Sequence, residues 1–325
     1  MRILGFCTLL AFSTSVLAEN FSIYGQAQAH LSTERAKTRG QVQVREAVGD
    51  EGTFIGFKGF KPLNHNLDVT YMNETALHFK KGHNDINTFT HQKQHWVGLR
   101  SVYGEWRVGK QYMPNKVLVH EMNQFKDQYG AATALINPDT SVSDSVLYIQ
   151  SLGNTEVALG VGRDRKGWLS PAKQNHKVLG GLINYKTAQG LVFSAGVEKK
   201  PSTYVDSRLS INYQKQSNQL GVLFQQLDTK SEQILGQDSK ALLVNASHTQ
   251  GKTTLKAQIG RKEDKSSAST QLGAIGVDHQ VDKKLRLYAE HSVMRDKDGS
   301  AQLGVGARLQ GAHVQATSVG LVYSF

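Results

Sequence analysis

Histidine is the residue type in this chain that most directly suggests metal or acid–base chemistry, because it binds metal ions and titrates near neutral pH. The chain has twelve histidines, and His91 and His95 are four residues apart. No HExxH pattern accompanies them. On a strand, four residues span ~13 Å, which is too far for two ligands of one ion. The spacing therefore favours surface or loop histidines, and we expect neither a metal ion nor another cofactor.

Signatures of enzymes are missing as well. Neither a GxSxG nucleophile turn nor a phosphate-binding GxxxxGK[ST] loop occurs in the chain. Asp, His and Ser residues cannot be grouped by spacing into a catalytic cluster. We expect a protein that is not an enzyme.

The strongest regularity is an alternation of polar and apolar residues over segments of about ten residues. In SIYGQAQAHL, one face holds Ile23, Ala27 and Leu31, whereas the other holds Gln26 and His30. The segments RLSINYQ, TTLKAQIGR and KLRLYAEHSV repeat this period of two. Such segments are strands with one apolar and one polar face, and their length suits tilted strands that cross a membrane.

The first eighteen residues are different. MRILGFCTLLAFSTSVLA carries one basic residue, an apolar run and a small final residue, which is typical of a secretory signal peptide cleaved after Ala18. Cys7, the only cysteine, lies within it, and the bulky Phe6 before it argues against a lipoprotein signal. After this stretch no apolar run reaches the ~18 residues of a membrane helix. We therefore expect residues 19–325 to be one exported domain without disulfides.

Short and long connections alternate between the expected strands. The short ones lie near 62–64, 102–104, 152–154, 188–190, 217–218, 249–251 and 281–283, and the long ones near 32–50, 80–90, 113–143, 164–174, 199–203, 229–238, 262–268 and 295–314. They divide residues 19–325 into sixteen strands. Inside hydrocarbon every backbone N–H and C=O needs a partner, so a sheet can cross a membrane only when it closes on itself.

The pattern thus predicts an all-β fold, a 16-stranded antiparallel transmembrane β-barrel with short periplasmic turns and long external loops. The last segment, ATSVGLVYSF, is expected to close the barrel against residues 20–31. The alternative is a soluble β-sandwich, whose core would need fuller apolar faces than these segments offer.

Four stretches in order resemble the trimeric general-diffusion porins of Gram-negative outer membranes. They are FSIYGQAQA near the start, TFIGFKGF at 53–60, QHWVGLRSVYGEWRVGKQYMP at 94–114 and SVGLVYSF at the end. The resemblance implies a homotrimer in the outer membrane, with a water-filled channel for passive diffusion of small hydrophilic solutes and ions. It also implies that the third loop, residues 113–143, folds inward and narrows the barrel, and that residues 80–90 form a latch between subunits.

In that family, acidic groups on the third loop face basic groups on the barrel wall. The resemblance assigns Glu121 and Asp127 to the loop and Lys58 and Lys93 to the wall. Phe54 and Ser143 depart from the pattern, since the family commonly has arginine at both positions. Alternation adds further inward-facing charges, namely Arg107, Arg208, Lys256 and Arg286, partly offset by Glu290.

The formal net charge of the chain is +11, and removal of residues 1–18 takes away only one charged residue, Arg2. Basic groups lining a pore repel cations and concentrate anions, so we expect a weak preference for anions. Alternatively, the excess lies on external loops and binds the phosphates of lipopolysaccharide; the candidates are Lys80, Lys81, Arg163, Arg165, Lys166, Lys199, Lys200 and Lys262. The export signal and the dispersed charges argue against nucleic acid as the partner.

The alternative function is a substrate-specific channel for sugars or oligosaccharides. Such a channel needs aromatic rings along the path on which sugar faces can stack. Alternation turns Tyr24, Phe54 and Tyr288 inward, whereas none of the three tryptophans is clearly placed there.

Overall fold

The computed structural model describes residues 20–38, 40–78, 89–138, 140–164, 176–201, 203–230, 238–266, 268–304 and 307–325. Nearly all regular structure is β. The strands are β1 (Asn20–Thr38), β2 (Gln41–Gly49), β3 (Phe54–Asn64), β4 (Leu67–Leu77), β5 (Phe89–Ser101), β6 (Gly104–Tyr112), β7 (Ser141–Leu152), β8 (Thr155–Asp164), β9 (His176–Lys186), β10 (Leu191–Lys200), β11 (Tyr204–Lys215), β12 (Asn218–Thr229), β13 (Ser239–Gln250), β14 (Thr253–Asp264), β15 (Ser269–Gln280), β16 (Leu285–Asp296) and β17 (His313–Ser324). Between β6 and β7 lie the helix α1 (Pro114–Met122) and the short 3₁₀ turn η1 (Ala132–Ala134).

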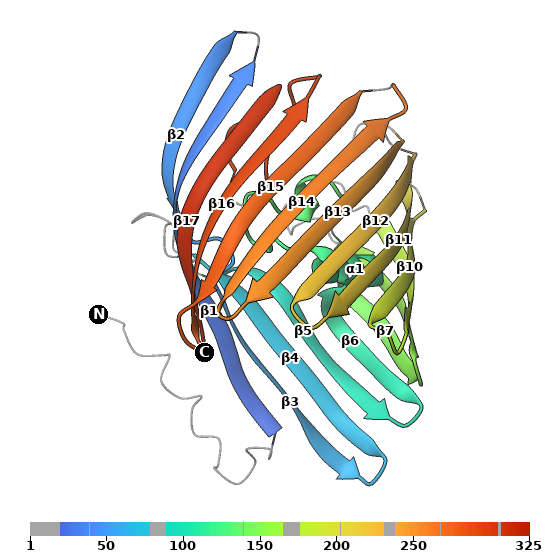
Figure 1. Cartoon of the computed structure of the whole chain (residues 1–325). Helices are drawn as coiled ribbons and strands as arrows, with labels where there is room; N and C mark the ends of the chain where they lie inside the picture. Colours follow the sequence, from blue (N-terminus) through green and yellow to red (C-terminus); the bar gives the residue numbers. More distant parts are fainter. Residues whose placement is uncertain are drawn as a thin grey trace, which may run out of the picture.

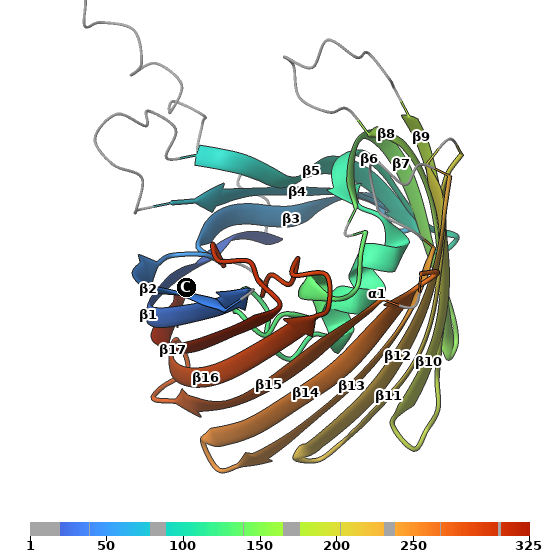
Figure 2. The same cartoon turned by 90° about the horizontal axis from the view of Figure 1, so that it is seen from above.

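The strands form one antiparallel sheet that closes on itself (Figures 1 and 2). Successive strands pair from β3 to β17, and β17 pairs with β1. The other edge of β1 pairs with β3 through residues 20–26 and with β2 through residues 30–38. Because β2 and β3 follow one another along the same edge, they occupy one position in the barrel, which is therefore sixteen strands around, as the sequence predicts.

The two ends of the chain's barrel domain meet at the closing seam. The register runs from Gln26 opposite Ser324 to Lys37 opposite His313. Gly25 and Phe325 exchange both backbone N–H···O bonds, each with an N–O distance of 3.1 Å. The prediction that the last strand closes the barrel is confirmed, although its partner is residues 26–37 instead of 20–31.

The predicted long loop at 32–50 is wrong. Strands β1 and β2 form a hairpin through this stretch, and it rises above its neighbours in Figure 1. The polar/apolar alternation used to locate strands fades here because the outward positions of β1 change from apolar residues to Thr33, Arg35 and Lys37, which are exposed. On the inward face Glu34 is fully buried and pairs with Arg45 at 3.0 Å, so the strand continues although its outer face is polar.

The break between β2 and β3 has a local cause. Residues 50–53 leave the sheet, so the backbone of Gln28 lacks a strand partner there. The Thr53 hydroxyl supplies one, accepting from the Gln28 N–H at 3.0 Å and donating to the Gln28 carbonyl at 3.2 Å. The segment also brings Gly52, with φ +93°, against the side chain of Asp127 in the third loop.

The outer and inner faces have opposite chemistry. Large apolar side chains point outward, and Ile23, Ile259 and Ile275 are 60–64% exposed. The inward face carries buried polar groups such as Gln258 and Ser292. This arrangement is the reverse of a soluble protein and suits an exterior bathed in hydrocarbon.

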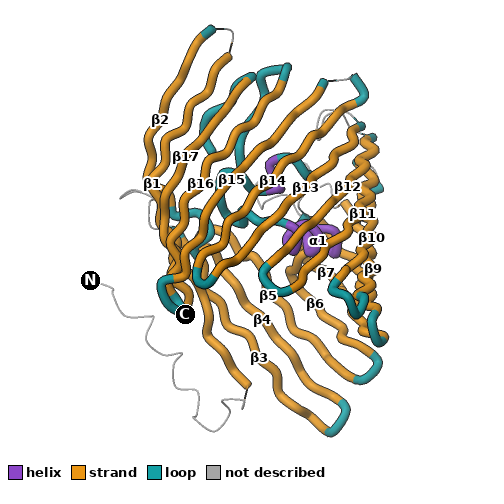
Figure 3. Tube along the Cα trace, viewed as in Figure 1, coloured by secondary structure: helices purple, strands orange, loops and turns teal. Residues whose placement is uncertain are grey.

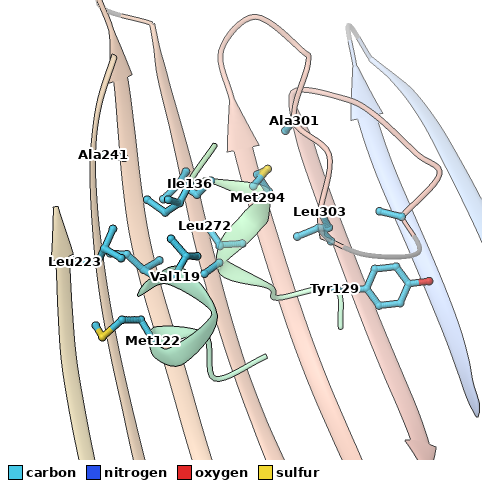
Figure 4. Close-up of a cluster of buried hydrophobic side chains, with 14 of the residues drawn as sticks. Val119, Met122, Tyr129, Ile136, Leu223, Ala241, Leu272, Met294, Ala301 and Leu303 are labelled. Carbon is cyan, nitrogen blue, oxygen red and sulfur yellow. The ribbon is translucent and has the colours of Figure 1, made fainter. Parts of the chain in front are cut away.

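The third loop folds into the barrel, as the resemblance implies. Pro114 occupies the start of α1, where its missing N–H costs nothing. Figure 3 shows the helix inside the ring of strands, and Figure 4 shows Val119, Met122 and Ile136 packed against Leu223 and other wall residues. The last loop contributes as well, since Ala301 and Leu303 join the same buried cluster.

Several expectations fall outside the described residues: the signal peptide at 1–18, most of the latch at 80–90, and most of the loops at 164–174 and 229–238. In the described part of the chain, no helix has the length and apolar character needed to span a membrane.

A disulfide across the seam tests barrel closure. Ala29 and Leu321 lie directly opposite each other on β1 and β17, so the Cα atoms are ~5.5 Å apart, within the range of a disulfide. We expect the A29C/L321C variant, made without residues 1–18, to form this bond quantitatively on oxidation. Its mobility on denaturing gels should shift until a reductant is added.

The matched control is A29C/V319C, in which the second cysteine is one row away on the same face. Equal cross-linking in both variants would contradict the register described for β1 and β17.

Candidate functional site

An interior cavity of about 1360 Å³ lies between the third loop and the wall formed by strands β3 to β6. Charged side chains of both signs line it. The basic ones are Lys58, Lys93, Arg100, Arg107, Lys110, Lys116, Lys126 and Arg286, and the acidic ones are Glu74, Glu105, Glu121, Asp127 and Asp278. Eight basic against five acidic groups give the cavity a positive balance.

Aromatic rings position several of these cations. The Lys58 Nζ lies 4.9 Å from the centre of the Tyr24 ring, and the Lys93 Nζ lies 4.4 Å from that of Phe54. The Arg107 guanidinium lies 4.2 Å from the Trp96 ring. A ring attracts a cation through its quadrupole without cancelling its charge. The rings therefore fix cations along the wall and leave their charge available to the lumen.

Carboxylates neutralise some of the charge. Glu105 pairs with Arg107 at 2.7 Å, and Asp278 pairs with Arg286 at 2.7 Å. Glu74 lies 3.8 Å from the Lys93 Nζ and accepts a hydrogen bond from the Tyr24 hydroxyl at 3.0 Å.

Some other cations in the cavity have no direct ion pair with a described carboxylate. Among the described residues, no carboxylate oxygen lies within 4.0 Å of the Nζ of Lys58, Lys110 or Lys126. The positive balance of the cavity thus survives its ion pairs.

The third loop supplies the opposite side of the cavity. Asp127 adopts a left-handed conformation (φ +56°), and its carbonyl accepts a hydrogen bond from the Gln28 side chain at 2.9 Å. Burial raises the pKa of Glu121, with the Glu156 carboxylate adding to the shift and Lys126 opposing it. Burial lowers the pKa of Lys126, against the effect of Glu121 and Asp127. Both groups therefore titrate closer to neutral pH than they would in water.

Two of the predicted residues do not reach the open cavity. Arg208 faces inward but lies beneath the loop, 1% exposed. Its guanidinium pairs with Asp206 at 2.9 Å and donates to the carbonyls of Asn115, at 2.8 Å, and Pro138. Arg208 thus ties both ends of the loop to β11.

Lys256 is similarly covered. It is 5% exposed, pairs with Asp278 at 2.9 Å and donates to the Gln128 side chain at 2.9 Å. The ring of Phe125 lies under its Nζ at 4.7 Å. This lysine joins β14 to the middle of the third loop.

Two buried glutamates complete the anchoring. Glu290 accepts the backbone N–H groups of Tyr129 and Gly130 at 3.0 and 3.2 Å. Glu34 accepts those of Arg308 and Leu309 in the last loop at 2.9 and 3.1 Å. Because each carboxylate satisfies otherwise unpaired backbone donors, both loops are held against the side of the barrel away from β3 to β6.

The remaining predicted residues, Lys58, Lys93, Arg107, Glu121, Asp127 and Arg286, are brought together around the cavity. Lys93 reaches it through a β-bulge, because Glu74 pairs with Gln94 and Thr75 with Gln92, leaving Lys93 without an opposite residue. A bulge re-aims side chains, so Lys93 and Gln94 both line the cavity.

Alternation missed Arg100, Lys110, Lys116 and Lys126 among the basic groups, and Glu74, Glu105 and Asp278 among the acidic ones. One signal was available for Lys110. Gly109 precedes it with φ +140°, and the register shifts between Gly109 and Gln111. A glycine within a strand often marks such an irregularity.

The aromatic residues differ from the expectation. Tyr288 faces inward but is buried, with its hydroxyl accepting from the Gln28 side chain at 3.2 Å. Trp96 lines the cavity, a position that alternation did not clearly indicate. Within the described ranges, no group of three or more His, Cys, Asp or Glu side chains could hold a metal ion.

Among known protein families, one family model matches this chain. Residues 7–299 match the family model described as Gram-negative porin. No curated protein sequence matches the chain.

Several solved structures share the fold. An anion-selective porin from Comamonas acidovorans superimposes with a TM-score of 0.77 at 17% identity, covering 94% of this chain and 99% of that one. OmpF of Salmonella typhi, solved with daunomycin, gives 0.70 at 14% identity, with 94% and 97% covered. The trimer form of OmpT from Vibrio cholerae gives 0.65 at 16% identity, with 94% and 99% covered.

Removal of the Arg208 guanidinium tests the anchoring of the third loop. In R208M, Asp206 stays buried with its charge unpaired, and such a change costs about 3–5 kcal/mol. We expect the loop to be cut faster by protease between residues 113 and 143, while the barrel itself stays intact. Limited proteolysis with mass spectrometry measures this.

R163M is the control, because the Arg163 side chain is exposed near the end of β8. Equal cleavage rates in R208M and R163M would contradict an anchoring role for Arg208.

Proposed function

Because this chain belongs to the Gram-negative porin family and forms a diffusion channel in the outer membrane, we propose that the channel passes small hydrophilic solutes and weakly prefers anions. The observation that carries the preference is the lining of the interior cavity, where basic side chains outnumber acidic ones by eight to five. In a narrow lumen with low-dielectric walls, this balance attracts anions and repels cations.

The constriction is proposed to lie between the third loop and strands β3 to β6. Glu121 and Asp127 on the loop face the cavity that Lys58, Lys93 and Arg107 line from the wall. Opposite charges across a narrow passage create a transverse field, which orients water and polar solutes and disfavours apolar ones. Arg208 and Lys256 contribute indirectly, by holding the loop in place.

Two solved structures with the same fold relate to the ion preference and the oligomeric state proposed for this channel. The Comamonas structure is described as anion-selective, and the Vibrio OmpT structure as a trimer. At 17% and 16% identity these likenesses concern the fold. They are compatible with the proposed anion preference and with a homotrimer.

A sugar-specific channel is the second candidate, favoured by the rings of Phe54, Phe60 and Trp96 in the lining. Against it, each of these rings already carries a cation of the protein on its face. A covered ring offers less area for stacking on a sugar, so the general pore accounts better for the arrangement. The family and fold indicate a channel, and we propose that it has no enzymatic activity.

Charge reversal on the wall tests the anion preference. In K58E/K93E, the lining changes from eight basic and five acidic groups to six and seven. We expect the reversal potential in a planar bilayer under a KCl gradient to move from the anion side of zero to the cation side. The shift should be larger at low salt, where the Debye length is longer.

K283E/K284E is the matched control, because both lysines are exposed in the short turn between β15 and β16. A wild-type reversal potential on the cation side would refute the preference, and the same shift in both variants would refute its origin at the wall.

A further inference from the structure

The outer surface of the barrel combines basic side chains and an apolar hollow at one place, on strands β14 to β16. The strand register sets Arg261 directly opposite Gln271, and Gln271 directly opposite Arg295. All three are exposed on the outer face. Since neighbouring strands are ~4.8 Å apart, the two arginines start about 10 Å apart, with an amide between them. Their side chains can therefore converge on one group.

The next row toward the middle of the barrel is apolar. Ile259, Gly273 and Val293 are opposite one another on the same three strands. Ile259 is 64% exposed, whereas a Cβ at Gly273 would have no atom within 4 Å. The missing side chain leaves a hollow between two aliphatic ones. With the arginines at its edge, it forms a cavity of about 490 Å³.

The position along the strands identifies the side of the membrane. Strands β14 and β13 are joined by a short turn after Gln250, and Arg261 lies near the opposite end, towards the longer connection after Asp264. In the channel, short turns face the periplasm and long loops face outward. The row of Arg261, Gln271 and Arg295 is therefore at the external edge of the apolar band.

The existing partners of the arginines leave them free to bind a ligand. Arg261 contacts Glu263, but both side chains are more than half exposed, and solvent-exposed pairs of this kind contribute little to stability. Lys240 lies opposite Glu263 on β13 and adds a third positive charge near the row. In the described part of the chain, no carboxylate oxygen lies within 4.0 Å of the Arg295 guanidinium.

We propose that this site, formed by Arg261, Gln271 and Arg295 above Gly273, binds a lipopolysaccharide molecule of the outer leaflet, with a phosphate on the arginines and an acyl chain over the glycine. Guanidinium groups bind phosphate oxygens through paired hydrogen bonds, and Gln271 adds a neutral donor between them. The apolar hollow directly below accepts hydrocarbon, which a free phosphate would leave unused. Charge and apolar surface together thus match a phosphorylated, acylated lipid.

The site differs from the loop residues that the sequence suggested for this role. Among the described ones, Lys200 is buried and Lys262 lines an interior cavity, so neither faces lipid. Arg163 and Lys199 are exposed but belong to other strands. The proposed site lies on paired strands, so its geometry is fixed before the lipid binds.

Native mass spectrometry of the refolded protein in detergent, titrated with bisphosphorylated lipid A, tests the proposal. We expect one tight site per chain, weakened about tenfold or more in R261Q/R295Q, since hydrogen bonds from charged donors to phosphate are stronger than those from a neutral amide. K283Q/K284Q, with the same loss of charge at the other end of the β15–β16 hairpin, should bind like the wild type. G273L, which fills the hollow, should also bind more weakly while keeping both arginines.

Channel conductance in planar bilayers shows that each variant is folded, because none of these residues lines the interior cavity. Equal affinity in R261Q/R295Q and K283Q/K284Q would overturn the site. Equal binding of dephosphorylated lipid A would overturn the role of the phosphate, and unchanged binding by G273L would overturn that of the hollow. Equal competition by phosphatidylglycerol would overturn the assignment to lipopolysaccharide. A wild-type reversal potential on the cation side, together with the expected lipid binding, would refute the anion preference and leave the lipid site supported.

Discussion

The whole structure depends on one constraint: within hydrocarbon, no backbone N–H or C=O can remain unpaired. The chain meets it by closing the sheet, with Gly25 and Phe325 bonded at the seam. Once the sheet closes, side chains must alternate between lipid and lumen, which separates apolar from polar residues along every strand. Where β2 and β3 break the pattern, the Thr53 hydroxyl replaces the missing backbone partner. The polar interior that makes a channel possible is a consequence of this pairing.

The interior is divided by how its polar groups are satisfied. Along β11 to β17, inward charged side chains such as Asp206, Arg208 and Glu290 bind the loops. Their charges are compensated by buried ion pairs and hydrogen bonds. Along β3 to β6, Lys58 lies on the Tyr24 ring and keeps its charge towards the cavity. Anchoring the loops on one side thus leaves a basic wall on the other. On the outer face of the sheet, β14 and β16 carry the exposed Arg261 and Arg295, to which we assign the lipid site.

Sequence reasoning recovered what depends on the period of two. The number of strands, the short turns and the inward direction of Arg107, Arg208 and Lys256 all follow from alternation. It could not tell that Arg208 and Lys256 are covered, because burial depends on where the third loop lies, and that is decided by contacts across more than 90 residues of sequence. It misjudged residues 32–50 because the outward positions there are polar, as at Arg35 and Lys37, instead of apolar. Strict alternation also could not indicate the β-bulge at Lys93.

The central claim is that water and ions follow the basic wall, while the opposite side is filled by the loop. Thiol accessibility of two inward glutamines tests it most directly: Gln94 lines the cavity, whereas Gln258 is 1% exposed and bonded to Gly130. In reconstituted channels without residues 1–18, Q94C should react with an anionic methanethiosulfonate faster than with a cationic one, and Q258C should react with neither. Equal reactivity at both positions, or faster modification of Q94C by the cationic reagent, would contradict the account.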